Sequence, residues 1–318
     1  MNKPRVAIAT GDPAGIGPEI SLKAALDPAV LKICQPVLVG DRAVLRTHAK
    51  ACGLSLEGIE LLEVKQEKPR IGTIAPAHGR AALASAEKAI RAALAGEFQA
   101  VLGAPHTETA IHAAGIEFDG YPSFVAKVCG LPPEDGVLML CFRHEGREVR
   151  IAHVTLHASV ANALKMISRK RVLKTVRAVH EALLKLGIAN PKIAVSGVNP
   201  HAGEAGAFGR EEIDIVDPAL QDAKREGIVA DGPIGADTLI QRKGYDAYVV
   251  MLHDQGHVAA KLLAPQRVAG LTIGTPVLFS SVAHGSAFDI AGQGKANHAA
   301  MVEAITRLVG RRRRPPAT

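Results

Sequence analysis

Short runs of β-branched and aliphatic residues alternate with Ala- and Leu-rich stretches along most of this chain. Strands are predicted over Arg5–Thr10, Pro36–Gly40, Ala100–Leu102, Gly136–Cys141, Val149–Thr155, Lys192–Ser196 and Ala247–Leu252. Helices are predicted over Gly17–Leu26, Ala81–Ala95, Arg169–Leu186 and Ala299–Val309. Such an alternation is typical of α/β proteins, in which helices cover a largely parallel sheet. The chain has neither internal repeats nor a long Gly/Ser linker.

The length of 318 residues predicts two domains of roughly 150 residues, or one large α/β unit. The apolar fraction of 47% can fill a sizeable core, and the charged fraction of 22% is ordinary for a soluble protein. The four cysteines have neither zinc-site nor disulfide spacing. No signal-like segment precedes the first strand, and no apolar run reaches the ~18 residues of a membrane span. We therefore expect a reduced, cytoplasmic protein without a membrane partner.

The net charge of +7 is concentrated at the C-terminal end of the sequence. Four of the basic residues form the run Arg311–Arg314, which a Pro-Pro pair follows. A terminal run of like charge is usually solvated. The chain contains no Trp and only 3% aromatic residues, so it offers few side chains for base stacking. Nucleic-acid binding is therefore not expected as the main function.

Three histidines follow three separate predicted strands. His157 ends the segment Val-Thr-Leu-His, His201 lies in a turn after Ser196, and His253 follows the strand that ends at Leu252. Imidazoles at the ends of neighbouring strands are suited to a divalent-metal site with an open coordination position. His153 and His257 are alternative ligands, since each lies four residues from one of these three. A surface or hydrogen-bonded core histidine is the alternative for each position.

The stretch from His284 to Asn297 is rich in glycine and has the character of a nucleotide-binding loop. Glycines at 285, 292 and 294 allow a ligand to approach the backbone closely. The Asp289 carboxylate is suited to accept bonds from both ribose hydroxyls and to repel the extra phosphate of NADP. A polar surface loop is the alternative for a glycine pattern alone.

The complete string from His284 to Asn297 resembles the adenosine-binding loop of the β-decarboxylating isopropylmalate and isocitrate dehydrogenases, except that Phe288 replaces their usual proline. In those enzymes an Asp-Ile pair, here Asp289-Ile290, accompanies NAD. The resemblance implies an α/β fold of two αβα domains with a cleft between them. It places one domain at residues 1–125 plus 265–318 and the other at residues 126–264. The implied cofactor-binding residues are His284, Gly285, Ala287, Asp289, Ile290 and Asn297.

Four further motifs resemble the 4-hydroxythreonine-4-phosphate dehydrogenase family of vitamin B6 biosynthesis. They are Gly11-Asp-Pro-Ala-Gly-Ile-Gly-Pro-Glu19, Asn199-Pro-His-Ala-Gly-Glu204, Gly235-Ala-Asp-Thr238 and His253-Asp-Gln-Gly256. The match runs from about residue 5 to residue 309. It implies that His157, His201 and His253 bind one divalent metal, which is zinc, magnesium, manganese or cobalt. It also implies a homodimer whose active site lies at the interface, with one metal ligand coming from the neighbouring subunit.

The sequence departs from that family at the expected substrate contacts. Gly120-Tyr121-Pro122-Ser123 replaces a His-Thr pair, Glu108 replaces a lysine, Gly270 replaces an asparagine and Phe279 replaces an arginine. Loss of an arginine removes a planar cation suited to phosphate. Charged hydrogen bonds contribute roughly 1.5–3 kcal/mol each, so two losses weaken phosphate binding by orders of magnitude. We expect a flatter, unphosphorylated substrate, contacted by Tyr121, Pro122, Ser123, Glu108 and Phe279.

Several segments resemble the terephthalate cis-dihydrodiol dehydrogenase branch of the family more closely. They are Glu108–His112, Gly120–Ser123, Val154–His157, Met251–His257 and Lys261–Pro265. This resemblance implies a metal-dependent NAD oxidoreductase that converts a cis-dihydrodiol carboxylate to protocatechuate by oxidative decarboxylation. The alternative substrates are 4-phosphohydroxy-L-threonine and a 4-phosphorylated sugar acid such as threonate 4-phosphate.

Lys261, Asp237 and Asp254 are the candidates for proton transfer and charge balance. Lys261 matches a substrate-contacting lysine of the family, and a nearby divalent ion would lower its pKa. An ordinary exposed lysine is the alternative. Asp254 can orient an imidazole through its free N–H, or it can form a structural ion pair. The sequence does not distinguish which of the three groups is the base.

Two other classes of protein are compatible with part of this sequence pattern. A phosphotransacylase-like transferase can share the fold and a Gly-rich loop, but it needs neither three histidines nor an NAD loop. A non-catalytic regulator tolerates the loss of metal ligands, and all three are present here. The segment Gly11–Glu19 is a strand-to-helix turn rather than a Rossmann pyrophosphate motif.

Overall fold

The computed structural model describes residues 3–265, 267–282 and 284–309. The Arg311–Arg314 run lies outside the described residues. The chain forms two compact units, one that extends to Pro133 and resumes at Pro276, and another from Glu134 to Thr275. Both unit limits come later than the predicted crossings near residues 125 and 265. The predicted α/β class is confirmed in each unit.

The first unit contains a sheet of parallel neighbours in the order β3-β2-β1-β4-β11. β1 lies at its centre, where Ala7 pairs with Val37 on one side and Val101 on the other. All strands therefore present their carboxyl ends at one edge. The strands are β1 (Arg5–Ala9), β2 (Gln35–Gly40), β3 (Glu60–Glu63), β4 (Ala100–Gly103) and β11 (Phe279–Val282).

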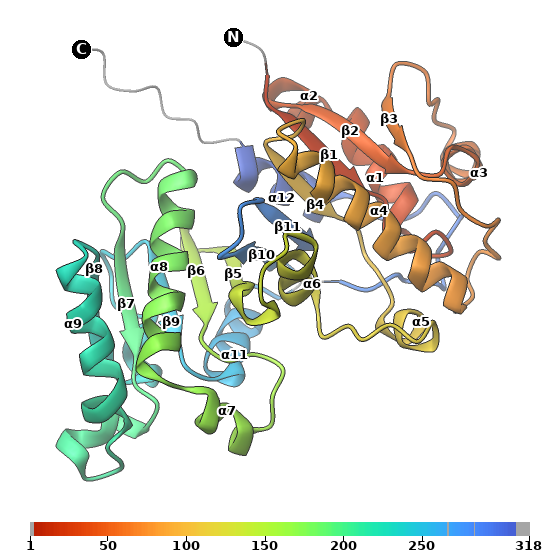
Figure 1. Ribbon diagram of the computed structural model, residues 1–318. Helices are drawn as coiled ribbons and strands as arrows, with labels where there is room; N and C mark the ends of the chain where they lie inside the picture. The colour runs from red at the N-terminus through yellow and green to blue at the C-terminus, as the bar shows by residue number, and fades with distance from the viewer. Residues whose placement is uncertain (1–2, 266, 283, 310–318) are drawn as a thin grey trace, which may run out of the picture. The chain divides into compact units, whose positions relative to one another are not determined.

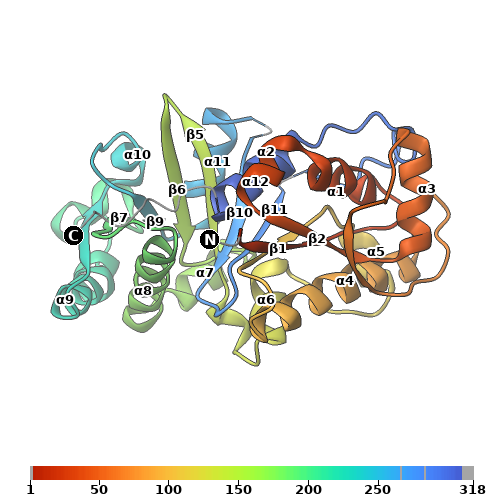
Figure 2. The same cartoon turned by 90° about the horizontal axis from the view of Figure 1, so that it is seen from above.

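Helices cover both faces of this sheet (Figures 1 and 2). One face carries α1 (Gly17–Leu26), α2 (Pro28–Ile33), α3 (Arg42–Cys52) and α12 (Ala299–Val309). The other carries α4 (Pro76–Leu94), α5 (Glu108–Ala113) and α6 (Tyr121–Val128). A fully buried core of small aliphatic side chains, including Ala7, Val39 and Val101, lies between α4 and the sheet. Small residues allow the long Ala-rich helix to approach closely.

The second unit has a mixed sheet in the order β10-β5-β6-β9-β7-β8. β5 pairs antiparallel with both neighbours, whereas the β6–β9, β9–β7 and β7–β8 pairs are parallel. The strands are β5 (Val137–His144), β6 (Arg147–His153), β7 (Lys192–Ser196), β8 (Val229–Ile234), β9 (Ala247–Val250) and β10 (Ala269–Ile273). Since β6, β7 and β9 run parallel, the segments after them emerge at one edge.

The helices of the second unit also lie on both faces of its sheet (Figure 2). α8 (Arg169–Lys185) and α9 (Asp217–Arg225) lie on one face, and α10 (Ala236–Leu239) and α11 (His253–Leu263) lie on the other. Shorter elements are α7 (Val160–Met166), η1 (Pro133–Asp135), η2 (Pro200–Gly206) and η3 (Glu212–Val216). No helix in the described ranges is long and apolar enough to cross a membrane.

The structure contains the strands and helices that the sequence predicts, although several of them begin or end at other residues. α1, α12 and β7 have the predicted bounds. α4 begins five residues earlier than predicted, at Pro76, because proline is favoured in the first helical turn. The sequence prediction did not include β3, β8, β10 and β11. These strands are short or interrupted by glycine and proline, so their alternation pattern is weak.

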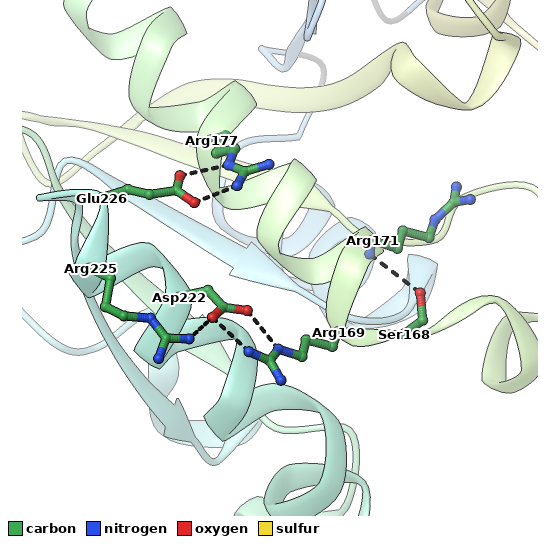
Figure 3. A network of polar contacts seen from close by, with 7 residues as sticks. All are labelled: Ser168, Arg169, Arg171, Arg177, Asp222, Arg225 and Glu226. Atoms are coloured by element: carbon green, nitrogen blue, oxygen red, sulfur yellow. Dashed lines mark hydrogen bonds and ion pairs between the residues drawn. The ribbon is translucent and has the colours of Figure 1, made fainter.

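Charged side chains join α8 to α9 on the surface of the second unit (Figure 3). Arg169 donates two parallel hydrogen bonds to the Asp222 carboxylate, at 2.6 and 2.7 Å. Arg225 forms an ion pair with the same carboxylate, and Arg177 forms an ion pair with Glu226. Two-pronged guanidinium–carboxylate pairs fix geometry better than single contacts do. The hydrogen bond from Arg169 is the largest influence that holds the pKa of Asp222 well below its ordinary value of 3.8.

We predict that Asp222→Asn lowers the melting temperature modestly, by at most about 2–4 °C at neutral pH, because the pairs are solvent-exposed. Since the folded-state pKa is depressed, this stabilisation is present above the ordinary pKa and is lost as pH falls through the folded value. Melting curves of wild type and variant should therefore converge in acid and in high salt. Asp214→Asn, which breaks a local pair with Arg210, is the control. A difference that grew on acidification would contradict this account.

Candidate functional site

In the first unit, three loops meet where parallel strands end. They follow β1, β4 and β11, and they contain Thr10–Gly17, Ala104–Thr107 and the segment that begins at His284. The turn after β1 is fixed by backbone bonds, with Asp12 N donating to Pro105 O at 2.9 Å. Carboxyl edges of parallel sheets are where α/β proteins bind ligands. The predicted cofactor-binding stretch, residues 284–297, is called the cofactor loop below. It therefore begins at the edge of the sheet where α/β proteins bind ligands.

The near end of the cofactor loop is attached to this edge through Ser286. Its carbonyl accepts the Ile16 N–H at 2.9 Å, and its hydroxyl lies 2.8 Å from the Thr107 hydroxyl. A Cβ on Gly15 would lie 2.6 Å from the Ser286 Cβ, so the approach requires glycine. The Gly11–Glu19 turn thus packs against Ser286 and fixes the position of the near end of the loop.

The middle of the loop has a backbone shape that presents its polar groups to solvent. Ala287 has a positive φ of 41°, and Gly292 and Gly294 both have 72°. Asp289 is exposed, and its carbonyl accepts a 2.7 Å bond from the Gln293 side chain. A Cβ on Gly285 would meet open space. Gly285 and the Asp289 side chain are therefore accessible, as the prediction of a nucleotide-binding loop requires.

The remaining predicted cofactor residues have different surroundings. His284 and Ile290 are half-buried, while Gly285 and Asn297 are exposed. The Asn297 side-chain oxygen accepts the Ala299 N–H at 2.9 Å at the start of α12. This bond uses the oxygen as a helix cap and leaves the amide N–H groups as donors for a ligand.

Asp12 is buried within the turn after β1. Its carboxylate accepts the Ala14 N–H at 2.9 Å and interacts with Thr107. Burial is the largest influence on its pKa, which is raised, and the hydrogen bonds oppose that increase. Asp12 therefore supports the loop edge rather than presenting a charge to solvent.

An aromatic cluster surrounds Tyr121 in the first unit. Its ring lies 4.6 Å from Phe279 and 4.6 Å from His106, with Phe118 at 5.8 Å and Phe124 at 6.4 Å, measured between centroids. Burial lowers the pKa of His106 to about 4, so this ring is neutral at physiological pH. The cluster is apolar and uncharged, where the family resemblance leads one to expect an arginine.

The predicted substrate residues divide by exposure. Phe279 has no exposed surface and packs in the core beneath Tyr121, while Pro122 is also buried. Ser123 donates to the Asp119 carboxylate at the start of α6, and Glu108 is exposed at the start of α5. Direct contact of these residues with a substrate stays a prediction. In this structure Phe279 acts by supporting the Tyr121 ring.

In the second unit, β6, β9 and β7 lead to the three predicted metal ligands. His157 follows β6, His253 begins α11 directly after β9, and His201 follows β7 within η2. The His157 and His253 ring centroids lie 5.8 Å apart. The His253 Nδ1 lies 2.6 Å from the Asp254 carboxylate. With Nδ1 donating to Asp254, Nε2 is the atom available to bind an ion.

The alternative ligands occupy positions beneath this pair. His153 is 3% exposed, and burial lowers its pKa to about 3. A Cβ on residue 256 would lie 2.3 Å from the His153 ring, so Gly256 allows α11 to rest on β6. His257 stacks on His253 with centroids 3.8 Å apart. Burial also lowers the pKa of His257, to about 4. Both rings stay neutral and support His253 from below.

His201 lies in a run of left-handed backbone. Residues His201 to Ala205 all have positive φ values, between 43° and 80°. The His201 side chain is exposed and pairs with Glu204 at 3.5 Å. Within the described part of one chain, no three His, Cys, Asp or Glu side chains are gathered as a metal site. His157 and His253 thus form an adjacent pair, and His201 stands apart from them.

The three proton-transfer candidates lie around α11. Asp237 and Asp254 line one pocket of about 590 Å³, together with apolar side chains that include Val258 and Leu262. Lys261 is exposed, two turns after His253 on the same helix, and its charge contributes to the lowered pKa of His257. The loop edge also contains residues that the sequence prediction missed: Thr107, Ser286, Glu19 and Lys23.

Comparison with known proteins extends over nearly all of the chain. It is 42% identical to the 1,2-dihydroxy-3,5-cyclohexadiene-1,4-dicarboxylate dehydrogenase of a Comamonas species, with 96% of each chain covered. The solved terephthalate 1,2-cis-dihydrodiol dehydrogenase of Burkholderia xenovorans is 43% identical, with a TM-score of 0.75 over 96% of this chain and 98% of that one.

The solved 4-hydroxythreonine-4-phosphate dehydrogenase of Klebsiella pneumoniae is 32% identical, with a TM-score of 0.83 over 96% of this chain and 98% of that one. A β-decarboxylating dehydrogenase of Thermococcus kodakarensis, 19% identical with a TM-score of 0.52, shares the fold alone over 97% of this chain and 82% of its own. The predicted fold resemblance is thus confirmed.

Fold and relatives together define an enzyme of the dehydrogenase class. The family model described as pyridoxal phosphate biosynthetic protein PdxA matches residues 32–308. The chain belongs to this family.

Proposed function

We propose that this protein is a metal-dependent NAD oxidoreductase that oxidatively decarboxylates a cis-dihydrodiol carboxylate, with terephthalate dihydrodiol giving protocatechuate. The observation that carries the proposal is the 42% identity, over 96% of both chains, to a dehydrogenase named for that dicarboxylate. The uncharged aromatic cluster around Tyr121 supports it, because the cluster supplies none of the cations that a phosphate needs.

The reaction balances with NAD as the only oxidant. The ring carbon next to the carboxylate-bearing carbon loses a hydride to NAD, and its hydroxyl proton goes to a base. This leaves a ketone β to the carboxylate. The bond between carbon and carboxylate then breaks, carbon dioxide leaves, and the electron pair forms an enolate that takes up a proton on oxygen. Aromatisation adds driving force. A divalent metal held by His157 and His253 would supply Lewis acidity to this reaction, as metals do in other enzymes.

The histidines of this chain fit part of the metal site. The neighbouring rings of His157 and His253 suit two ligands of one ion, and Asp254 holds the His253 ring in the required tautomer. His201 is separate within one chain. The homodimer implied by the family resemblance resolves this, because a second subunit contributes the missing ligand. The active site then lies at the dimer interface.

Lys261 and Asp237 lie on or near α11, where they can transfer a proton or balance charge. Lys261 lies two turns beyond His253, on the exposed side of the helix. Its amine serves as the base for the hydroxyl proton and later as the donor to the enolate oxygen. Asp237 shares a pocket with Asp254 and balances the positive charge of the site.

The proposed cofactor-binding loop belongs to the first unit. The loop from His284 to Asn297 presents open backbone around Gly285 and an exposed Asp289 carboxylate. That carboxylate accepts bonds from both hydroxyls of the adenosine ribose. The same negative charge disfavours a 2′-phosphate, so the loop selects NAD over NADP.

Oxidation of 4-phosphohydroxy-L-threonine, or of a related acid such as threonate 4-phosphate, is the second candidate function. The similarity to the Klebsiella enzyme, at a TM-score of 0.83, favours it. The buried Phe279 ring and its neutral surroundings weigh against it, since a phosphate needs cations. Arg242, Lys243 or a cation from the second subunit would then have to supply them.

We predict that replacing any one of His157, His201 and His253 with Ala lowers kcat/KM at least about 100-fold and reduces bound metal, because each removes a ligand. Steady-state kinetics and metal analysis of the dialysed protein measure both effects. His153→Gln and His257→Gln should retain more metal than the three Ala variants do. A His201→Ala protein with full activity would rule out this ligand set.

We predict a preference for NAD over NADP of about tenfold or more in kcat/KM, since a 1.4 kcal/mol repulsion already gives a factor of ten. Asp289→Lys should shift the preference towards NADP, because an ammonium group attracts the 2′-phosphate. Asp289→Asn is the matched control and should only weaken the discrimination. Equal specificity constants in the wild type would show that Asp289 does not face the ribose.

We predict that terephthalate dihydrodiol is turned over with a kcat/KM at least about 100-fold above that of 4-phosphohydroxy-L-threonine, since a phosphate lacking its charged bonds binds orders of magnitude more weakly. Absorbance of NADH and of the aromatic product gives two independent readings of the reaction. Threonate 4-phosphate should be as poor as the threonine substrate. Faster turnover of either phosphate would overturn the substrate assignment and favour the second candidate function.

A further inference from the structure

The far end of the cofactor loop is held by a buried carboxylate on α1. Glu19 has no exposed surface, and its two oxygens accept the Ala296 N–H at 2.7 Å and the Gly294 N–H at 3.2 Å. These residues are more than 270 positions apart in the sequence. Carboxylate bonds to backbone N–H groups are charge-assisted and therefore strong, and they leave little freedom at the loop residues concerned.

Lys23, one turn further along α1, completes this attachment. Its ammonium donates to Glu19 Oε1 at 2.8 Å, to the Gly294 carbonyl at 2.9 Å and to the Ala296 carbonyl at 2.8 Å. All three ammonium hydrogens are thus used. The pair holds both the N–H and the C=O of the same two loop residues. Each member depends on the other, because a buried carboxylate without its cation is costly.

The surroundings of Gly294 leave the loop backbone few alternative conformations. Gly294 has a φ of 72°, and a Cβ there would lie 2.7 Å from the Ala51 carbonyl on α3. At the near end of the loop, Ile16 N–H bonds to the Ser286 carbonyl. Ile16, the residue before α1, and Glu19 and Lys23, in the first and last turns of α1, therefore hold the two ends of one loop. The stretch between them, Ala287–Gln293, contains Asp289.

We propose that Glu19 and Lys23 are positioning residues of the cofactor site. By fixing Gly294 and Ala296, they set the place of Asn297 and hold the loop in the shape that receives the adenosine half of NAD. They act through the loop backbone and touch no reacting atom. This inference rests on the proposed function, since it requires that the loop binds NAD.

A role in positioning the adenosine half has a distinct kinetic signature. Loosening the loop lowers the affinity for NAD, while hydride transfer and substrate binding depend on other residues. The KM for NAD therefore rises, and kcat and the KM for the dihydrodiol stay the same. A general loss of folding would instead reduce the amount of active enzyme, which lowers kcat and leaves both KM values in place.

The experiment compares full-length wild type with Glu19→Gln and Lys23→Met. Glu87→Gln is the matched control, because it breaks the pair with Arg91, which has the same spacing on α4 but is exposed and distant from the loop. Calorimetric titration with NAD and with ADP-ribose, which lacks the nicotinamide, measures binding to the adenosine half directly. Steady-state kinetics with NAD and dihydrodiol give the separate KM values.

Both variants should bind NAD and ADP-ribose about tenfold more weakly or worse, as expected for the loss of charged hydrogen bonds. The kcat and the KM for dihydrodiol should stay within twofold of wild type, and Glu87→Gln should behave as wild type throughout. If a single variant does not fold because it leaves a buried charge unpaired, the double variant Glu19→Gln/Lys23→Met decides, since it removes both charges together.

Two failures can be told apart. Wild-type affinity for NAD and ADP-ribose in both variants would overturn the positioning role and leave the proposed function intact. A fall in kcat with unchanged affinity would also overturn it. A wild-type protein that binds neither NAD nor ADP-ribose would overturn the proposed function, and this inference with it.

Discussion

Parallel pairing of strands is the constraint on which the cofactor loop of the first unit and the histidines of the second unit both depend. When neighbouring strands run in the same direction, every loop at their carboxyl ends emerges at one edge. In the first unit this brings the segments after β1, β4 and β11 together, although β1 ends at Ala9 and β11 begins at Phe279. In the second unit it does the same for β6, β7 and β9, which lead to His157, His201 and His253. The candidate site residues of each unit therefore follow strands that end at the same edge of a sheet.

Much of this fold can be predicted from the sequence, because the spacing of apolar residues and the local composition indicate individual strands and helices. Buried parallel strands appear as short apolar runs, and β1, β4 and β7 were found on that basis. β8 and β10 were missed, since Gly232, Pro233 and Gly270 interrupt their patterns, and their pairing is decided by partners distant in the sequence. The histidines were found as strand-end residues. What the sequence does not contain is the distance between them, which depends on loop paths such as the left-handed run at His201.

The supports of the cofactor loop illustrate the same limit. Glu19 and Lys23 have the i, i+4 spacing of an ordinary helical ion pair, and that spacing is visible in the sequence. Their engagement with residues near 294 is a tertiary fact. The motif Gly11–Glu19 gave a partial signal, because its glycines allow contacts that no other residue permits, as Gly15 does beside Ser286. A charged side chain that is buried in a turn motif, as Glu19 is, thus indicates that it binds a segment distant in the sequence.

Gly256 has a consequence for how this enzyme can diverge. Its missing side chain lets α11 rest on the His153 ring, and every larger residue would meet that ring or the Ile151 side chain. The helix that begins with His253 is therefore tied to β6 at a fixed height, independently of what the site binds. A residue larger than glycine at position 256 requires a smaller side chain at position 153 first, whereas position 153 can change alone, so the order of mutations is itself constrained.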